Sequence, residues 1–216
     1  MLTTTMQAPA GPLRAVAPRV RGVTLIELIV TLAIFGILFA LGLPTFNNWI
    51  RNNQIRGVAE SLQNGLRTAQ QEAVRRSRTV VFFQTYATPM VGAPAAYGGR
   101  NWAVQYVPTA IDTPVLPEPV VHAGSMSDVG TNRVLVLGTN GGGNVTAICF
   151  NANGRLITST PAANGVVNAN CNASATTFNI GYVGGGVDRP LQVRVELGGR
   201  VRMCDPGRPA TAPDGC

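Results

Sequence analysis

RGVTLIELIVTLAIFGILFALGL, residues 21–43, decides the fold of this 216-residue chain. From Val23 to Leu43 the stretch has 21 residues and one charged side chain, Glu27. A helix of that length rises about 32 Å, which matches a bilayer hydrocarbon core of about 30 Å. Three arginines precede it, at positions 14, 19 and 21. The stretch therefore predicts a single-pass membrane helix over 23–43 with a cytoplasmic N-terminus.

Two simpler interpretations of this stretch are a secretory signal and a plain signal anchor. A secretory signal has an apolar core of about 7–15 residues without a charge, so it fits poorly, although a weak small-residue site exists around Ala40–Gly42. A carboxylate within the bilayer costs several kcal/mol unless it is paired, so Glu27 indicates a function. The alternative is that Glu27 reaches the cytoplasmic interface, because it lies near the start of the helix.

The residues Gly22-Val23-Thr24-Leu25-Ile26-Glu27 resemble the processing site of prepilins, the precursors of type IV pilins and type II secretion pseudopilins. The resemblance implies that a prepilin peptidase removes the leader, 1–22, after Gly22 and methylates Val23. The cost of a buried carboxylate supports the resemblance independently: after cleavage Glu27 is the fifth residue, and the new amine of Val23 on a neighbouring subunit is a natural partner for it in the apolar core of a filament. One departure from the family pattern is Val23, at a position where phenylalanine is usual.

Pro44 follows the apolar stretch and removes one backbone hydrogen bond, so it predicts a kink or local melting of the helix. The resemblance implies local unwinding there in the filament. Residues 44–78 predict an amphipathic continuation of the same helix, ending near Arg76–Arg78, where cations suit its C-terminal dipole. Its apolar positions recur at spacings of three and four: Ile55, Val58, Leu62, Leu66, Ala69 and Ala73.

The remaining residues, 79–216, predict a periplasmic β-rich domain with long loops, because Gly (25) and Pro (15) are plentiful. The expected loops are 86–100, 108–130 and 159–176. Strands are expected at 79–85, 102–107, 133–137, 145–151, 155–158, 177–182, 192–197 and 201–204, with a turn at 151–154. The predicted class is α+β, a long N-terminal helix packed on antiparallel sheet. Together with LRTAQQEAVRR (66–76) and CFNANGR (149–155), this pattern resembles the FimT/GspH family of minor pilins and pseudopilins.

Four cysteines, Cys149, Cys171, Cys204 and Cys216, all follow the apolar stretch. None forms a Cys-x-x-Cys pair, which argues against a zinc ribbon. An even number on the translocated side indicates two disulfides in an oxidising compartment. Chain order favours Cys149–Cys171 and Cys204–Cys216, but three pairings are possible. The second pair would tie down a proline-rich tail that has little else to hold it.

Residues 192–204 predict a β-hairpin near the C-terminus. A two-residue loop of Gly198-Gly199 would put Val195 on the same face as Arg202. A three-residue loop, 198–200, instead pairs Val195 with Met203 and leaves the charged side chains on the opposite, exposed face. The second register is preferred because it separates apolar from charged side chains.

The same hairpin contains Gly199-Arg200-Val201-Arg202, a Gly-Arg-x-Arg pattern. It resembles the DNA-binding motif of FimT-type pilins that act in natural transformation, and guanidinium groups bind phosphate bidentately. The arginines expected to form such a patch are Arg189, Arg194, Arg200, Arg202 and Arg208. Aromatic residues do not interleave with them, so base stacking is not implied. The alternative is a solvated or protein-contacting face on which Arg202 pairs with Glu196 across the strands.

The sequence does not indicate an enzyme, a cofactor or a metal site. Its single histidine, His122, lies in a proline-rich loop without a nucleophile arranged near it. The glycine runs 141–143 and 184–186 lack the Lys-Ser/Thr of a phosphate loop. The net charge is +7, and without the leader fourteen arginines face ten acids, so charge alone is a weak argument for nucleic acid.

The sequence therefore predicts a minor pilin or pseudopilin, made as an inner-membrane protein with a periplasmic domain. After processing it is expected to enter a filament that serves pilus biogenesis or protein secretion, and to help initiate or cap it. Its expected partners are other pilins or pseudopilins, the prepilin peptidase and the inner membrane, with DNA as a further candidate. The alternative function is a DNA-binding tip subunit for DNA uptake. A type IV pilus and a type II secretion pseudopilus are both compatible with these residues.

Overall fold

The computed structural model describes residues 22–108, 119–129, 132–184 and 188–216, and it leaves out the side chains of 41–45. Helix α1 runs from Leu25 to Arg76. Pro44 falls inside these bounds, and the kink expected there stays a prediction. The chain divides into two compact units, Met1–Leu43 and Pro44–Cys216. Each unit is described by itself below.

In the first unit, Thr24 caps the start of α1. Its hydroxyl oxygen accepts a hydrogen bond from the backbone N–H of Glu27 at 3.3 Å, and its carbonyl accepts one from the N–H of Leu28 at 3.2 Å. A threonine followed three residues later by glutamate is a common helix start, because it satisfies donors that the first turn leaves free. Across the described residues, no helical stretch combines the length and the apolar character that a membrane crossing needs.

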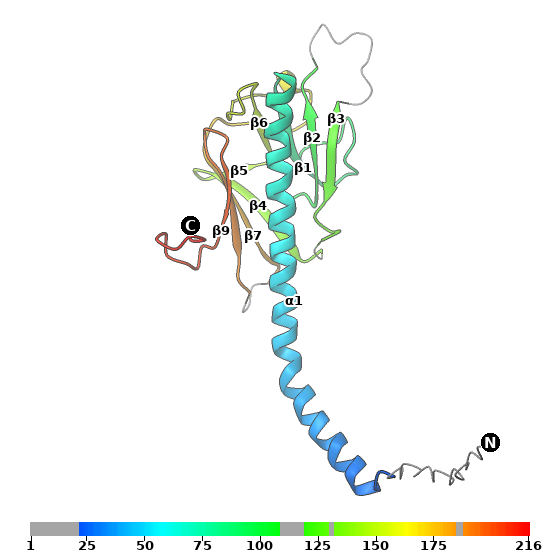
Figure 1. Cartoon of the computed structure of the whole chain (residues 1–216). Helices are drawn as coiled ribbons and strands as arrows, with labels where there is room; N and C mark the ends of the chain where they lie inside the picture. The colour runs from blue at the N-terminus through cyan, green and yellow to red at the C-terminus, as the bar shows by residue number, and fades with distance from the viewer. Residues whose placement is uncertain (1–21, 109–118, 130–131, 185–187) are drawn as a thin grey trace, which may run out of the picture. The chain divides into compact units, whose positions relative to one another are not determined.

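In the second unit, the rest of α1 lies against two antiparallel sheets (Figure 1). The first sheet has the order β3-β2-β1-β6 and consists of β1 (Val80–Thr85), β2 (Asn101–Tyr106), β3 (Val120–Ser125) and β6 (Ala147–Phe150). The second has the order β5-β4-β7-β8-β9 and consists of β4 (Val134–Asn140), β5 (Gly143–Val145), β7 (Thr176–Tyr182), β8 (Leu191–Val195) and β9 (Val201–Cys204). This arrangement confirms the predicted α+β class.

The apolar stripe predicted for α1 is the core face of the helix. Its fully buried residues are Ile55, Val58, Ala59, Leu62, Leu66, Ala69 and Ala73. Phe82 and Phe150 from the first sheet and Phe178 from the second belong to the same core. Burying one large apolar side chain contributes about 1.5–3 kcal/mol, so this stripe holds the helix on both sheets.

The helix ends at Arg76, as the sequence predicted. Ser77 then takes a left-handed conformation with φ 52°, and the N–H of Arg78 donates to the carbonyl of Ala73 at 3.1 Å. These two features define a Schellman motif, which satisfies carbonyls that the last turn leaves free. The residue in the left-handed position is usually glycine, so Ser77 carries some backbone strain.

Glu72 forms a small ionic cluster on the last turns of α1. Its carboxylate accepts hydrogen bonds from Arg75 at 2.7 and 3.0 Å and from Arg76 at 2.8 Å, and the residue is 8% exposed. The bonds from Arg75 lower the pKa of Glu72, partial burial opposes this shift, and the bond from Arg76 adds to the lowering. The guanidinium of Arg76 also lies over the ring of Tyr106, 5.0 Å from its centre.

The strand expected at 155–158 is wrong. The side-chain oxygen of Asn151 accepts the N–H groups of Asn153 and Arg155, each at 3.0 Å, which confirms the tight turn at 151–154. Within 155–158 the strand is reduced to one isolated bridge, between Phe150 and Leu156, together with a bond from the N–H of Ile157 to the carbonyl of Cys149. The segment therefore covers the free edge of β6 without becoming a regular strand.

Three further expectations need correction. The strand expected at 145–151 is divided, because β5 ends at Val145 in the second sheet and β6 begins at Ala147 in the first. The expected loop 108–130 contains strand β3, which pairs with β2 across an irregularity at Val104/Gln105. The expected loop 159–176 contains a short helix, α2, at Pro161–Asn164. Pro119 directly precedes β3 and Pro161 is the first residue of α2, and because proline usually marks loops, both elements were missed.

Candidate functional site

Two regions carry the predicted functional residues, and the first is the N-terminal end of α1. Gly22 and Val23 lie before the first turn of the helix, in the open: a side-chain carbon added at Gly22 would meet nothing within 4 Å, and Val23 is 71% exposed. Among residues 22–43, the described part of this unit, none covers the Gly22–Val23 peptide bond. Glu27 follows in the first helical turn and is exposed.

Glu27 is surrounded in sequence by apolar side chains that the first unit leaves exposed. These are Val23, Leu25, Ile26, Leu28, Ile29, Val30, Leu32, Ile34, Phe35, Ile37, Leu38 and Phe39. Thr31, a polar residue among them, satisfies its hydroxyl locally by donating to the carbonyl of Leu28 at 2.9 Å. An exposed apolar surface of this extent marks an interaction site. Glu27 is thus an ionisable group within an exposed apolar surface of the kind that binds lipid or protein.

The second region is the C-terminal hairpin, where both registers considered from sequence are wrong. Val195 pairs with Val201, and Arg194 pairs with Arg202. The N–H of Glu196 donates to the carbonyl of Arg200 at 3.0 Å, so the loop has three residues, 197–199. The expected loop length is correct, but the loop begins one residue earlier.

The position of the loop has a local cause. Gly199, its third residue, has φ 88°. Three-residue hairpin loops place a left-handed residue third, and glycine adopts that conformation at little cost. In the expected loop, 198–200, the left-handed position would have fallen on Arg200. Leu197 leaves the buried face as a result and is 51% exposed in the turn.

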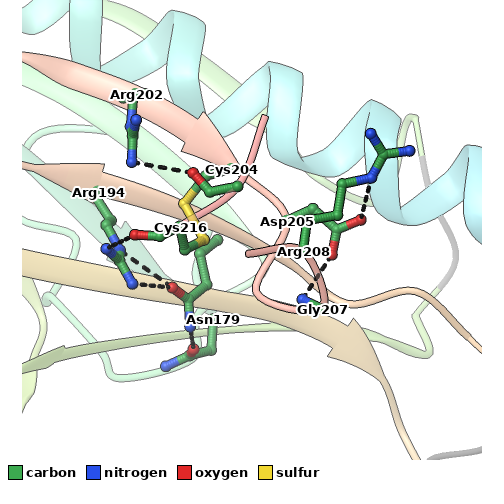
Figure 2. Close-up of a disulfide and its surroundings, with 10 residues drawn as sticks. Asn179, Arg194, Arg202, Cys204, Asp205, Gly207, Arg208 and Cys216 are labelled. Atoms are coloured by element: carbon green, nitrogen blue, oxygen red, sulfur yellow. Dashed lines mark hydrogen bonds and ion pairs between the residues drawn. A yellow bond between two sulfur atoms is a disulfide. The ribbon is translucent and has the colours of Figure 1, made fainter. Parts of the chain in front are cut away.

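Arg194 and Arg202 lie directly opposite each other and bind the C-terminal tail (Figure 2). Arg194 donates through Nη1 to the backbone oxygen of Cys216 at 2.8 Å and through Nε and Nη2 to the side-chain oxygen of Gln192. Arg202 donates through Nη2 to the carbonyl of Gly215 at 3.3 Å. The expected cross-strand pair of Arg202 with Glu196 is therefore wrong, because Arg202 lies opposite Arg194 and binds Gly215.

Arg189 and Arg208 meet instead at Asp205, a residue that the sequence analysis missed. The carboxylate of Asp205 is mostly buried and accepts from Nη2 of Arg189 and from the N–H of Gly207. Arg208 lies 3.9 Å from the same carboxylate (Figure 2). It also donates to Asp214 at 2.8 Å. A signal was available, because Asp205 and Arg208 are three residues apart in a short cysteine-closed tail. Arg200 lies exposed beside the hairpin turn.

Both disulfides form in the pairing that chain order favoured. Cys149–Cys171 has a Cα separation of 5.5 Å, and Cys204–Cys216 has one of 5.1 Å. The four cysteines are therefore all used as cross-links. Within the ranges that the structure describes, no three His, Cys, Asp or Glu side chains gather into a set that would hold a metal ion.

A family model described as type II transport protein GspH matches residues 58–199, which is well over half of the chain. The chain belongs to the GspH family. The model of the prokaryotic N-terminal methylation motif also matches, at residues 18–43. With both features, this GspH-family chain is a minor pilin or pseudopilin subunit with the fold class that its sequence predicted.

Solved structures similar to this GspH-family chain include pilin-like proteins from three bacteria. The type IV minor pilin FimU of Pseudomonas aeruginosa is 19% identical, with a TM-score of 0.46 over 78% of this chain and 98% of FimU. The minor pseudopilin EpsH from the type 2 secretion system of Vibrio cholerae is 11% identical, with a TM-score of 0.45 over 72% and 99%. GspH of Escherichia coli is 10% identical, with a TM-score of 0.42 over 74% and 95%. A comparison with curated protein sequences gave no match.

Proposed function

We propose that a prepilin peptidase cuts this chain after Gly22 and methylates Val23, and that the mature subunit then assembles with other pilins or pseudopilins. The observation that carries the proposal is the exposed apolar surface of α1 with Glu27 within it. A surface of this kind is stable only when lipid or other apolar helices cover it. The match of the methylation motif over residues 18–43 supports the same site of processing.

Before assembly, the segment 23–43 lies in the inner membrane, with the leader in the cytoplasm and the second unit in the periplasm. The arginines of the leader favour this orientation, and two disulfides suit an oxidising compartment. After cleavage, Glu27 and the new amine of Val23 on a neighbouring subunit neutralise each other. Removing either charge then leaves the other unpaired in apolar surroundings, which costs about 3–5 kcal/mol.

The test is the mass of the chain recovered from membranes that contain a prepilin peptidase. We expect a start at Val23 with one added methyl group. Gly22→Val, which crowds the cleavage site, should leave the leader attached. An intact native chain, or a start downstream of Val23, would remove the proposal.

Assembly is tested separately by Glu27→Gln, which should be cut and methylated normally but should no longer co-purify with partner pilins. Glu60→Gln is the matched control, because Glu60 forms only an exposed ion pair with Arg56 on the same helix. Its co-purification should be unchanged. The identity of the recovered partners, pilus or secretion-system subunits, decides between the two kinds of filament.

DNA binding is not proposed as a second function. The comparisons give no support for it, and the guanidinium groups of Arg189, Arg194, Arg202 and Arg208 are engaged within the chain.

A further inference from the structure

Two exposed aromatic rings, Phe46 and Trp49, stand on α1 just before the folded body begins. Phe46 is 56% exposed and Trp49 is 60% exposed, and their rings stack on each other with centres 5.8 Å apart. Stacking on one helix face is possible because they are three residues apart. The pair presents one continuous aromatic surface that the body of the second unit does not cover.

Contacts between α1 and the body are made at Arg51 and Asn52, a little further along the helix. Arg51 lies over the ring of Tyr182, 5.0 Å from its centre, and the side chain of Asn52 accepts the N–H of Arg189 at 2.9 Å. Ile55 is the first fully buried residue of the helix core. Phe46 and Trp49 therefore occupy the short interval between the apolar segment, which ends at Leu43, and the body.

We infer that this pair is an anchor in the lipid headgroup layer on the periplasmic side of the membrane. The inference rests on the proposed membrane segment 23–43. Phe46 and Trp49 follow Leu43 by three and six residues, which corresponds to about 4.5 and 9 Å of rise along a helix. The headgroup layer is roughly 5–8 Å thick on each side of the hydrocarbon core.

The chemistry of the pair suits that layer. Helical side chains lean toward the N-terminus, so the ring of Trp49 reaches back by part of a turn toward the lipid. An indole has an apolar body and one N–H donor, and this combination favours the boundary between acyl chains and headgroups. Asn47 and Asn48, beside the pair, are polar and uncharged, and such residues also tolerate that boundary. The anchor fixes how deep the helix sits before the subunit is extracted into a filament.

The experiment uses the full chain in vesicles of equal parts phosphatidylethanolamine and phosphatidylglycerol. The vesicles contain lipids brominated either near the carbonyl end or near the methyl end of the acyl chain. Bromine quenches only nearby tryptophans, and the chain has two, Trp49 and Trp102. The difference between wild type and Trp49→Phe isolates Trp49 without changing Trp102, which packs against Phe82 in the body.

We expect bromine near the carbonyl end to reduce the Trp49 signal about twofold and bromine near the methyl end to reduce it less. The Trp49→Phe chain should show almost no quenching by either lipid. Equal or stronger quenching by the deep bromine would overturn the inference. So would an unquenched Trp49 whose emission shifts with protein concentration, since that result places the ring against a second copy of the chain.

Alkaline extraction of the same vesicles separates this inference from the proposal beneath it. Release of the chain into the supernatant would contradict the membrane segment itself. A chain that stays in the vesicles with an unquenched Trp49 would contradict only the aromatic anchor.

Discussion

Replacing Gly199 by alanine should destabilise the second unit far more than the same change at its neighbour, Gly198. Gly199 has φ 88°, and a left-handed conformation costs an L-residue about 1–2 kcal/mol. A side-chain carbon there would lie 1.9 Å from the carbonyl oxygen of Gly154 and 2.4 Å from the side-chain nitrogen of Gln70. The chain must therefore separate at this point.

Separation breaks two hydrogen bonds that hold the hairpin turn to its surroundings. Gln70 donates to the carbonyl of Gly154 at 2.9 Å, and the N–H of Leu156 donates to the carbonyl of Leu197 at 3.1 Å. Each bond contributes about 1 kcal/mol. With the backbone strain, the loss of unfolding free energy for Gly199→Ala comes to about 3–4 kcal/mol.

Urea unfolding of the full chain in detergent, followed by circular dichroism, measures this loss. At a slope of about 2 kcal/mol per M, the urea midpoint should fall by about 1.5–2 M for Gly199→Ala. Gly198 has open space where a side chain would be added, so Gly198→Ala should change the free energy by less than about 0.5 kcal/mol. Equal midpoints for the two variants would refute the argument that close contact with Gly154 fixes this turn.

Three other predictions concern stability and use the same unfolding assay. Glu72→Gln should lower the unfolding free energy by about 1–3 kcal/mol at neutral pH. The control Glu60→Gln, at an exposed ion pair, should lower it by less than about 0.5 kcal/mol. The pKa of Glu72 is lowered in the folded state. Its contribution to stability is therefore complete above the unfolded-state pKa and is lost as pH falls through the folded-state pKa. The unfolding free energies of wild type and Glu72→Gln should converge in acid. Ser77→Gly should raise the unfolding free energy by about 0.5–1 kcal/mol, because glycine adopts the left-handed conformation of residue 77 without strain. Ser77→Ala should not raise it. Changing Cys204 and Cys216 together to serine should cost about 3 kcal/mol, and a loss below about 1 would show that the tail does not depend on its cross-link.

The sequence predicted the long helix and its core face because both depend on periodicity alone. Ile55, Leu62 and Ala73 recur at helical spacing, and this spacing decides which side of the helix is buried. Strand β3 at Val120–Ser125 was missed for the opposite reason. It lies at the edge of its sheet, and its pairing with β2 depends on residues distant in the chain, which local propensity does not contain.

The register of the hairpin shows where pattern reasoning stops. The expected pairing of Val195 with Met203 and the observed pairing with Val201 differ by two residues, so both place the same side chains on the buried face. Hydrophobic patterning therefore cannot choose between them. The turn can choose, since only one of the two loops has glycine at its left-handed third position.

The correct register also changes what the arginines do. Two guanidinium groups directly opposite each other on one face of a sheet repel, so Arg194 and Arg202 need acceptors between or beside them. The tail supplies these as the backbone oxygens of Gly215 and Cys216, and the Cys204–Cys216 disulfide holds the tail in place. Arg194 and Arg202 are therefore better explained as the residues that bind the C-terminal tail. The disulfide is the cross-link that keeps the tail bound to them.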